Sequence, residues 1–153
     1  MDLILWRHAE AVEVAPGGDD MARVLTPRGE KQAARMAAWL DRQLPDSARI
    51  WVSPSRRTEQ TAHALDRKFR FSPALGPMGT SEQLLQLVQW PNGKGCVLVI
   101  GHQPTLGQTI AQLLGLNASE CSVKKGSLWW LRSREREDGA QTVVVTVQSP
   151  EVL

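Results

Sequence analysis

The stretch DLILWRH, residues 2–8, decides how this chain folds. Asp2 to Trp6 is an apolar run without strict alternation of polar and apolar residues, as expected for a β-strand that is covered on both faces. Arg7 and His8 follow at once, so the strand ends in a fixed positive charge and a side chain that titrates near neutral pH. The stretch therefore predicts a buried strand of an α/β fold and marks its carboxyl end as a place to look for chemistry.

Similar short runs, rich in aliphatic, β-branched or tryptophan residues, follow along the chain. They span Ala48 to Val52, Cys96 to Ile100, Ser127 to Leu131 and Thr142 to Val147. The last two runs flank the polar segment Ser133 to Gly139, within which Glu135 to Gly139 is typical of a hairpin connection. This pair of strands must therefore be antiparallel.

Helical patterns occupy the segments between these runs. One begins at Thr26-Pro27, a cap followed by proline at the first helical position, and another begins near Ser53-Pro54-Ser55. A third begins at Thr80, whose spacing to Gln83 predicts a capping box, and a fourth begins at Pro104. The positions predicted to face the core are Ala33, Met36, Ala37, Leu40 and Leu44 in the first helix, Ala62, Leu65 and Phe69 in the second, Leu84, Leu85 and Val88 in the third, and Leu106, Ile110, Leu113 and Leu114 in the fourth.

Strands that alternate with helices predict a largely parallel sheet with helices on both faces. The length of 153 residues and the 42% share of hydrophobic residues suit one compact core. We therefore predict a single domain over residues 1–153, built as a three-layer α/β/α sandwich around a mostly parallel central sheet.

The overall composition argues against several classes of function. Charged residues make up 22% of the chain and the formal net charge is +2, which gives no independent case for binding nucleic acid or a membrane surface. No stretch approaches the roughly 20 apolar residues of a membrane span, and Asp2 and Arg7 interrupt the region where a signal peptide would need an apolar run. We therefore expect a cytoplasmic protein. Cys96 and Cys121 fit neither a disulfide framework nor a zinc site, and we expect no metal or other cofactor.

Three of the predicted strands end in residues of similar chemistry. The first runs into Arg7-His8, the second into Ser53-Pro54 with Arg56 and Arg57 just beyond, and the Cys96 strand into Gly101-His102. Because the carboxyl ends of parallel strands meet at one edge of a sheet, two imidazoles and at least two guanidinium groups should gather there.

Such an edge has the parts that phosphoryl transfer requires. A neutral imidazole can attack phosphorus, and the phosphoramidate that it forms is labile enough to be hydrolysed. Arginine offers paired donors shaped for phosphate oxygens and keeps its charge. Transfer depends mainly on positioning and on fixed positive charge around the phosphoryl oxygens. The edge thus supplies a nucleophile, two clamps and a second histidine for a phosphate pocket.

The same residues lie in segments that resemble motifs of the histidine phosphatase superfamily, also called phosphoglycerate-mutase-like. The segments occur in family order and span most of the chain. They are Arg7-His8-Ala9, similar to Arg-His-Gly; Leu25-Thr26-Pro27-Arg28-Gly29, similar to Leu-Thr-x-x-Gly; Ser53 to Ala62, similar to Ser-x-x-x-Arg-x-x-Gln-Thr-Ala; and Gly101-His102, similar to the segment of the second histidine.

The resemblance implies a role for each matching residue. His8 would be the nucleophile and carry the phosphohistidine intermediate, Arg7 and Arg57 would clamp the phosphate, and His102 would be the second pocket histidine. The register of the motif selects Arg57 and leaves Arg56 exposed. Ala9 departs from the family's glycine and would make the pocket slightly tighter.

The connection between the second arginine and the second histidine is short. About 44 residues separate Arg57 from His102, too few for the long helical insert that carries an acidic proton donor in many members. The compact form resembles the SixA-like phosphohistidine phosphatase branch, which implies an open site that accepts a histidine-containing phosphotransfer domain of a bacterial signalling relay. Glu82, near the start of the third helix, is the remaining candidate for a proton donor, although the helix dipole alone favours an acidic residue there.

Each of these residues also has a structural interpretation. His8 could be a hydrogen-bonded histidine at a strand end, His102 could cap the Pro104 helix, and Arg57 could pair with a carboxylate. Trp129-Trp130 cannot line one surface together because adjacent strand residues face opposite sides, so core packing is the default. His63 has no partner motif. Asp19, Asp20 and Arg23 are expected in a solvated loop, with a weaker case for contact with substrate.

Two other functions remain open at this stage. One is a small-molecule phosphomonoesterase, which would use the same chemistry on a phosphate ester. The other is a phosphate-binding or regulatory module without turnover, which the presence of Arg7, His8, Arg57 and His102 argues against.

Overall fold

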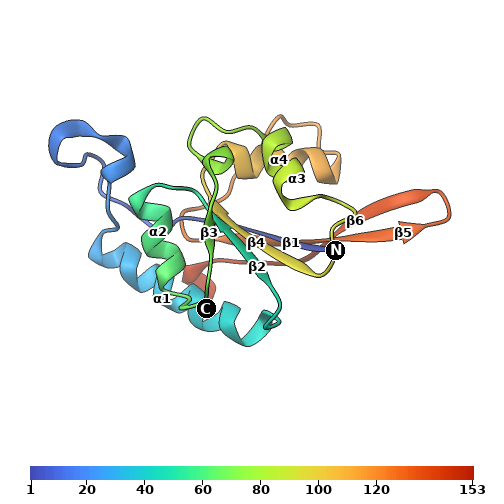
Figure 1. Ribbon diagram of the computed structural model, residues 1–153, viewed down its shortest axis with the longest axis horizontal. Coiled ribbons are helices and arrows are strands. Elements are labelled where there is room, and N and C mark those ends of the chain that lie inside the picture. Colours follow the sequence, from blue (N-terminus) through green and yellow to red (C-terminus); the bar gives the residue numbers. More distant parts are fainter.

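The computed structural model describes residues 1–153 and contains a six-stranded sheet with helices on both faces (Figure 1). The strand order is β3-β2-β4-β1-β5-β6. Their bounds are β1 (Asp2–Arg7), β2 (Arg49–Val52), β3 (Arg70–Phe71), β4 (Cys96–Gly101), β5 (Leu128–Arg136) and β6 (Gly139–Gln148). Strands β1 to β4 pair in parallel, and β5 is antiparallel to both β1 and β6. The predicted mostly parallel sheet is therefore confirmed.

Four α-helices cover the two faces of this sheet. They are α1 (Pro27–Gln43), α2 (Arg56–His63), α3 (Ser81–Val88) and α4 (Thr105–Leu114). The residues of β1 alternate between two hydrophobic clusters, with Ile4 and Trp6 toward α1 and α2, and Leu3 and Leu5 toward α3 and α4. In Figure 1 α1 lies below the sheet, with α2 beside it at the left, and α3 and α4 lie above the sheet. The three-layer sandwich is thus confirmed.

Local sequence signals set the starts of the helices. The Thr26 hydroxyl accepts a hydrogen bond from the Gly29 amide at 3.0 Å, with Pro27 at the first helical position. Thr80 and Gln83 form the predicted reciprocal capping box at the start of α3. Each of these caps satisfies amide groups that a helix leaves unpaired at its first turn, which is why the starts were predictable.

Several element boundaries differ from the sequence prediction. Helix α2 ends at His63, because the chain leaves the helix at Asp66, whose φ is +55°; Leu65 is buried beyond the helix and Phe69 is only partly buried. Strand β3 was not predicted. Helix α4 begins at Thr105, with Pro104 as the N-cap residue that precedes it. Leu113 and Leu114, which were predicted to face the core, are half-buried.

The hairpin connection is also shorter than predicted. Strand β5 continues to Arg136 and β6 begins at Gly139, so most of the polar segment is paired as strand. Exposed polar residues can form a ladder of backbone hydrogen bonds without burying either face, and hydrophobic patterning gives no sign of such strands. The two adjacent tryptophans face opposite clusters as predicted, Trp129 toward α4 and Trp130 toward α1.

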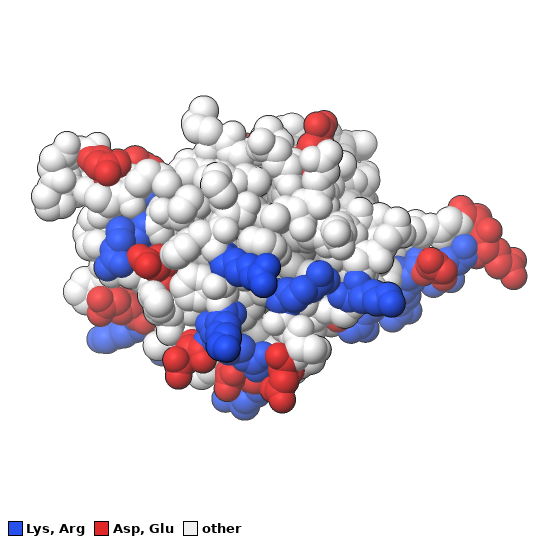
Figure 2. Space-filling view, in the orientation of Figure 1, with Lys and Arg blue, Asp and Glu red and all other residues white.

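The charged side chains are unevenly distributed over the surface. Figure 2 shows Lys and Arg in a row across the lower half of this face, with Asp and Glu close by, whereas the surface over α3 and α4 carries few charges. No helix of the structure is at once long enough and apolar enough to cross a membrane.

Candidate active site

Sheet pairing brings the two motif histidines together. Arg7 of β1 lies opposite Gly101 of β4, so His8 and His102 are the next residues of two adjacent parallel strands. The His8 amide continues the pairing by donating to the Gly101 carbonyl at 3.2 Å. The ring centroids of His8 and His102 lie 5.4 Å apart, with an angle of 58° between the ring planes. The rings therefore face one space at the carboxyl edge of the sheet.

His8 is held as a neutral imidazole with a free Nε2. Its Nδ1 lies 2.7 Å from the carbonyl oxygen of Ala9, and because a carbonyl only accepts, Nδ1 must carry the proton. The residue is 5% exposed, and burial, with the neighbouring charges of His102, Arg57 and Arg7, lowers the pKa of His8 to about 3. At neutral pH the lone pair of Nε2 is available for attack.

His102 has one engaged nitrogen and one free nitrogen. Nε2 lies 2.7 Å from the hydroxyl of Ser53, which follows β2, while Nδ1 is buried without a hydrogen-bond partner. Burial and the Arg57 charge lower the pKa of His102 to about 4, so this ring is also neutral at pH 7. If the Ser53 hydroxyl donates to Nε2, Nδ1 carries the proton and is left as an unpaired donor.

The two motif arginines are each held from one side. Nη1 and Nη2 of Arg57 donate to the backbone and carboxylate oxygens of Asp20, at 2.8 and 3.1 Å. Nη1 of Arg7 donates to the carbonyl of Val123 at 2.8 Å. Burial, and then the charge of Arg57, lowers the pKa of Arg7 below its usual value.

The Nε atoms of both arginines are buried without a partner, as is Nδ1 of His102. Buried polar groups are almost always hydrogen-bonded in folded proteins. Three buried nitrogens without a partner, all in side chains of this site, therefore indicate that a bound group accepts hydrogen bonds here. The pKa values of both histidines are lowered mainly by burial, and the positive charges of Arg57 and Arg7 lower them further. The site therefore has the charge and the donors to bind an oxyanion beside Nε2 of His8.

The remaining candidates lie outside this group. Arg56 is exposed as predicted and pairs with Glu59, which also lies 3.8 Å from the exposed ring of His63. His63 is the last residue of α2, not a mid-helix residue as its surroundings in the sequence suggested. Glu82 is exposed in the first turn of α3 and makes no hydrogen bond or ion pair.

Arg57 does pair with a carboxylate, but not with one on its own helix. Asp20 lies in a short 3₁₀ turn (Asp20–Ala22) of the loop between β1 and α1, a loop that was expected to be solvated. Sequence reasoning missed this contact, and it also missed the contact between Ser53 and His102. No local pattern could reveal either contact, because 37 and 49 residues separate the partners.

Other motif residues hold the loops around the site. The Thr61 hydroxyl accepts from the Ala9 amide at 3.1 Å, and the Gln60 side chain accepts from the Leu25 amide at 2.7 Å. Gly29 is buried where a Cβ would overlap the carbonyl of Glu10. These contacts join α2, the start of α1 and the segment after β1. Some motif residues therefore stabilise the fold around the site.

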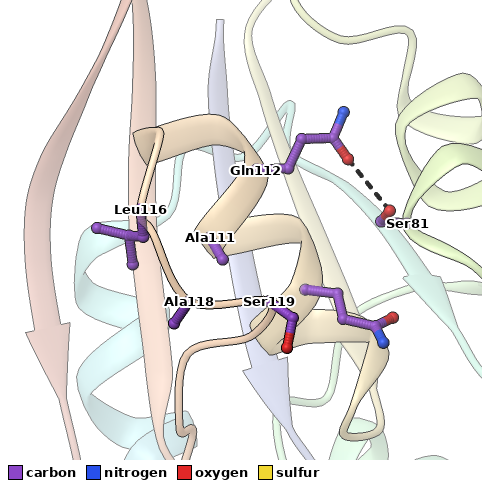
Figure 3. A pocket seen from close by; sticks show the side chains of 7 residues that line it. Ser81, Ala111, Gln112, Leu116, Ala118 and Ser119 are labelled. Carbon is purple, nitrogen blue, oxygen red and sulfur yellow. Dashed lines mark hydrogen bonds between the residues drawn. The ribbon is translucent and has the colours of Figure 1, made fainter.

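A cavity of about 320 Å³ beside α4 lacks the histidine and arginine side chains that the site above contains (Figure 3). It is lined by Ser81, Gln108, Ala111, Gln112, Leu116, Ala118 and Ser119. Its one hydrogen bond joins the Ser81 hydroxyl to the Gln112 amide oxygen at 3.2 Å, and none of its side chains is titratable. Nowhere in the chain do three His, Cys, Asp or Glu side chains gather so that they could hold a metal ion.

Known proteins resemble this chain in both sequence and structure. The sequence profile of the Histidine phosphatase superfamily (branch 1) matches residues 3–77. The phosphohistidine phosphatase SixA homolog of Haemophilus influenzae is 31% identical over 75% of this chain and 78% of its own length. The phosphohistidine phosphatase SixA of Escherichia coli is 32% identical over 74% of each chain.

A solved structure extends the likeness over the whole chain. The structure of the protein histidine phosphatase SixA complexed with tungstate has a TM-score of 0.78 to this chain at 27% identity, covering 99% of both chains. The fold, the motif order and these relatives agree. The chain belongs to the histidine phosphatase superfamily and is a phosphatase of the SixA type.

Proposed function

We propose that this phosphatase removes phosphoryl groups from phosphohistidine side chains of proteins, through a covalent intermediate on Nε2 of His8. The observation that carries the proposal is the neutral Nε2 of His8 in a site with three buried nitrogens that have no partner. Two are the Nε donors of Arg7 and Arg57, and the third is Nδ1 of His102, a donor when Ser53 donates to Nε2 of that ring. The lone pair supplies a nucleophile, and the donors match the oxygens of a phosphoryl group.

In the first step the Nε2 lone pair of His8 attacks phosphorus. An N–P bond forms on His8, the bond from phosphorus to the substrate imidazole breaks, and its electron pair leaves with that imidazole. When the other nitrogen of the leaving ring carries a proton, the ring departs neutral and needs no external acid. The hydrogen bond from Nδ1 of His8 to Ala9 stabilises the positive charge that the attacking ring acquires.

In the second step water attacks the phosphorus of phospho-His8. The bond between phosphorus and Nε2 breaks, the electron pair returns to His8, and inorganic phosphate leaves as H₂PO₄⁻ with the oxygen and both protons of the water. Arg7 and Arg57 keep their charge through both steps and hold the equatorial phosphoryl oxygens, so that phosphorus stays in line with the attacking and leaving atoms. Since the leaving imidazole asks for no acid, the exposed position of Glu82 is compatible with turnover.

The proposed substrate is a histidine-containing phosphotransfer domain in the cytoplasm. Two relatives are named phosphohistidine phosphatases. The segment from α2 to β4 supports the choice, because it holds only β3, a short 3₁₀ turn and the eight residues of α3, with no long helical insert to close over the site. A phosphorylated side chain on a protein surface needs that access.

The experiment compares two substrate classes and two variants. A phosphotransfer domain that carries phosphohistidine and a small ester such as p-nitrophenyl phosphate are each supplied to the wild type, to His8→Ala and to His63→Ala. We expect the phosphoprotein to be preferred, His8→Ala to lose turnover of both substrates, and His63→Ala, which alters an exposed ring at the end of α2, to match the wild type. Unchanged turnover in His8→Ala would rule out the nucleophile, and a strong preference for the ester would assign the enzyme to small phosphomonoesters.

A further inference from the structure

Arg57 is the more deeply buried of the two motif arginines, and its only carboxylate partner comes from a distant loop. The Arg57 side chain is 5% exposed, whereas the Asp20 side chain that it contacts is 55% exposed. Asp20 offers two acceptors to one guanidinium, the backbone carbonyl to Nη1 and a carboxylate oxygen to Nη2. A single residue thus holds the whole end of the Arg57 side chain.

The contact with Asp20 uses only one of the two edges through which the guanidinium group of Arg57 can bind an oxyanion. The group has two edges that can bind an oxyanion with paired donors, the end formed by Nη1 and Nη2 and the side formed by Nε and Nη2. Asp20 occupies the end. The side has no partner in the protein, because Nε is buried without a hydrogen bond and the second hydrogen of Nη2 is not used by Asp20.

The loop that carries Asp20 is itself tied down. Arg23 donates from Nη1 to the other Asp20 carboxylate oxygen at 3.1 Å, and from Nε to the carbonyl of Val12 at 2.7 Å. Val12 and Val24 are joined by a backbone hydrogen bond of 2.8 Å at the base of the loop. Figure 1 shows this loop as the blue segment that projects beyond α2. The hydrogen bonds of Arg23 and of the loop backbone therefore hold Asp20 in place against Arg57.

We infer that Asp20 is a positioning residue for Arg57, which turns the Nε and Nη2 edge of the guanidinium toward the phosphoryl oxygens. Asp20 touches no reacting atom; it acts by fixing the orientation of the arginine. The inference rests on the proposed function, because it assumes that the open edge of Arg57 binds phosphate.

The negative charge of Asp20 should affect anion binding in the opposite direction from its hydrogen bonds to Arg57. A carboxylate near an oxyanion repels it, so if Asp20 acted mainly through charge, its removal would tighten the binding of anions. If Asp20 acts through its acceptor oxygens, removal of the side chain leaves Arg57 held only by the backbone carbonyl of residue 20 and weakens binding. Asp20→Asn separates the two effects, because asparagine keeps one acceptor oxygen and removes the charge.

The experiment measures tungstate binding to the full-length protein by calorimetry. We expect Asp20→Ala to bind tungstate roughly tenfold more weakly than the wild type, the size of one charge-assisted hydrogen bond at a half-exposed carboxylate. Asp20→Asn should stay within about threefold of the wild type. Glu13→Ala is the matched control, because it removes an exposed carboxylate of the same loop that makes no hydrogen bond or ion pair, and it should leave the affinity unchanged.

A double-mutant cycle distinguishes positioning from a general effect on the fold. In the Arg57→Ala background, Asp20→Ala should cause no further loss of affinity. Equal losses in both backgrounds, or tighter binding by Asp20→Ala and Asp20→Asn, would overturn the inference. Weak tungstate binding by Arg57→Ala together with wild-type binding by Asp20→Ala would overturn it and leave the proposed function intact. A wild-type protein that binds no tungstate would overturn both.

Discussion

His8 has two properties that suit it for attack on phosphorus, a neutral ring and a fixed tautomer. Burial and the charges nearby keep the ring neutral, with a pKa lowered to about 3, while the hydrogen bond to Ala9 settles which nitrogen holds the proton. A histidine at its ordinary pKa would be partly protonated near neutral pH and would lose the lone pair that attacks phosphorus. The environment thus prepares the residue for nucleophilic attack.

The lowered pKa of His8 predicts a dependence of stability on pH. In the unfolded chain the ring binds a proton near pH 6.5, whereas in the folded protein it does so only near pH 3. The unfolded state therefore gains protons first as the pH falls, and the free energy of unfolding drops between about pH 6.5 and pH 3. The contribution is fully present above pH 6.5.

We expect the wild type to lose more stability than His8→Asn between pH 7 and pH 4, by on the order of a few kcal/mol. Urea unfolding at a series of pH values measures the difference. Parallel curves for the two proteins would show that the folded environment does not hold His8 neutral.

At this scale the sequence predicted which residues gather, but not how they are held. His8, Arg57 and His102 each follow a recognisable apolar run or belong to a motif, so their meeting at one edge could be foreseen. Ser53 and Asp20 contact their partners only through the tertiary fold, and the residue type alone does not tell a loop aspartate that holds an arginine from one that faces solvent.

Among the elements, the start of α1 depends on a close approach of two backbone segments. The first turn of α1 packs against the chain after β1, where the Glu10 carbonyl accepts from the Thr26 amide at 3.0 Å. A Cβ at Gly29 would overlap that same carbonyl. This contact explains the glycine of the Leu-Thr-x-x-Gly segment by space, since Gly29 lies in an ordinary helical turn.

Gly29→Ala should destabilise the protein by about 2 kcal/mol or more. Alanine would gain about 1 kcal/mol of helix propensity over glycine, but the overlap with backbone cannot be relieved by rotating a side chain, so the clash dominates. Thermal or urea unfolding measures the change. Glu30→Ala, one residue later and exposed, is the control and should change little; a Gly29→Ala protein as stable as that control would contradict the packing argument.

The elements also show where pattern reading succeeds and fails. Starts with a capping residue were predicted within a residue or two, because the cap is a local contact. The end of α2 was placed too late, since Phe69 continues the helical period although the chain has already turned at Asp66. Strand β3 was missed because two exposed residues carry no periodic signal.

On the scale of the whole molecule, the sheet separates the site from the hairpin. Strand β5 begins beside Trp6, next to the site, and runs away from it, because β5 is antiparallel to β1. The last residues of β5 and the first residues of β6 form a hairpin that extends beyond the opposite edge of the sheet, on the right in Figure 1. All side chains from Arg134 to Gln141 are exposed.

Replacing Glu135–Ala140 by Asn-Gly should therefore leave tungstate affinity and turnover unchanged. The two-residue turn would join Arg134 to Gln141, which already face each other in the register, and the removed residues bury nothing. Kinetic comparison of the shortened and full-length proteins checks the expectation. A clear loss of turnover on the phosphoprotein alone would show that the hairpin contacts the partner.

The strand order could not be read from the sequence, although the fold class could. Alternating strands and helices predicted a mostly parallel sheet, but pairing of β1 with both β4 and β5 depends on long-range packing that no single segment encodes. It is this order that makes Arg7 and Gly101 neighbours and sets the two histidines side by side.

A crystal structure with vanadate tests the central claim most directly, because vanadate can form the five-coordinate arrangement of phosphoryl transfer at a nitrogen nucleophile. The account predicts vanadium bonded to Nε2 of His8, with its oxygens accepting from the Nε atoms of Arg7 and Arg57 and from Nδ1 of His102. Vanadate bound at another residue, or held away from Nε2 of His8, would contradict it.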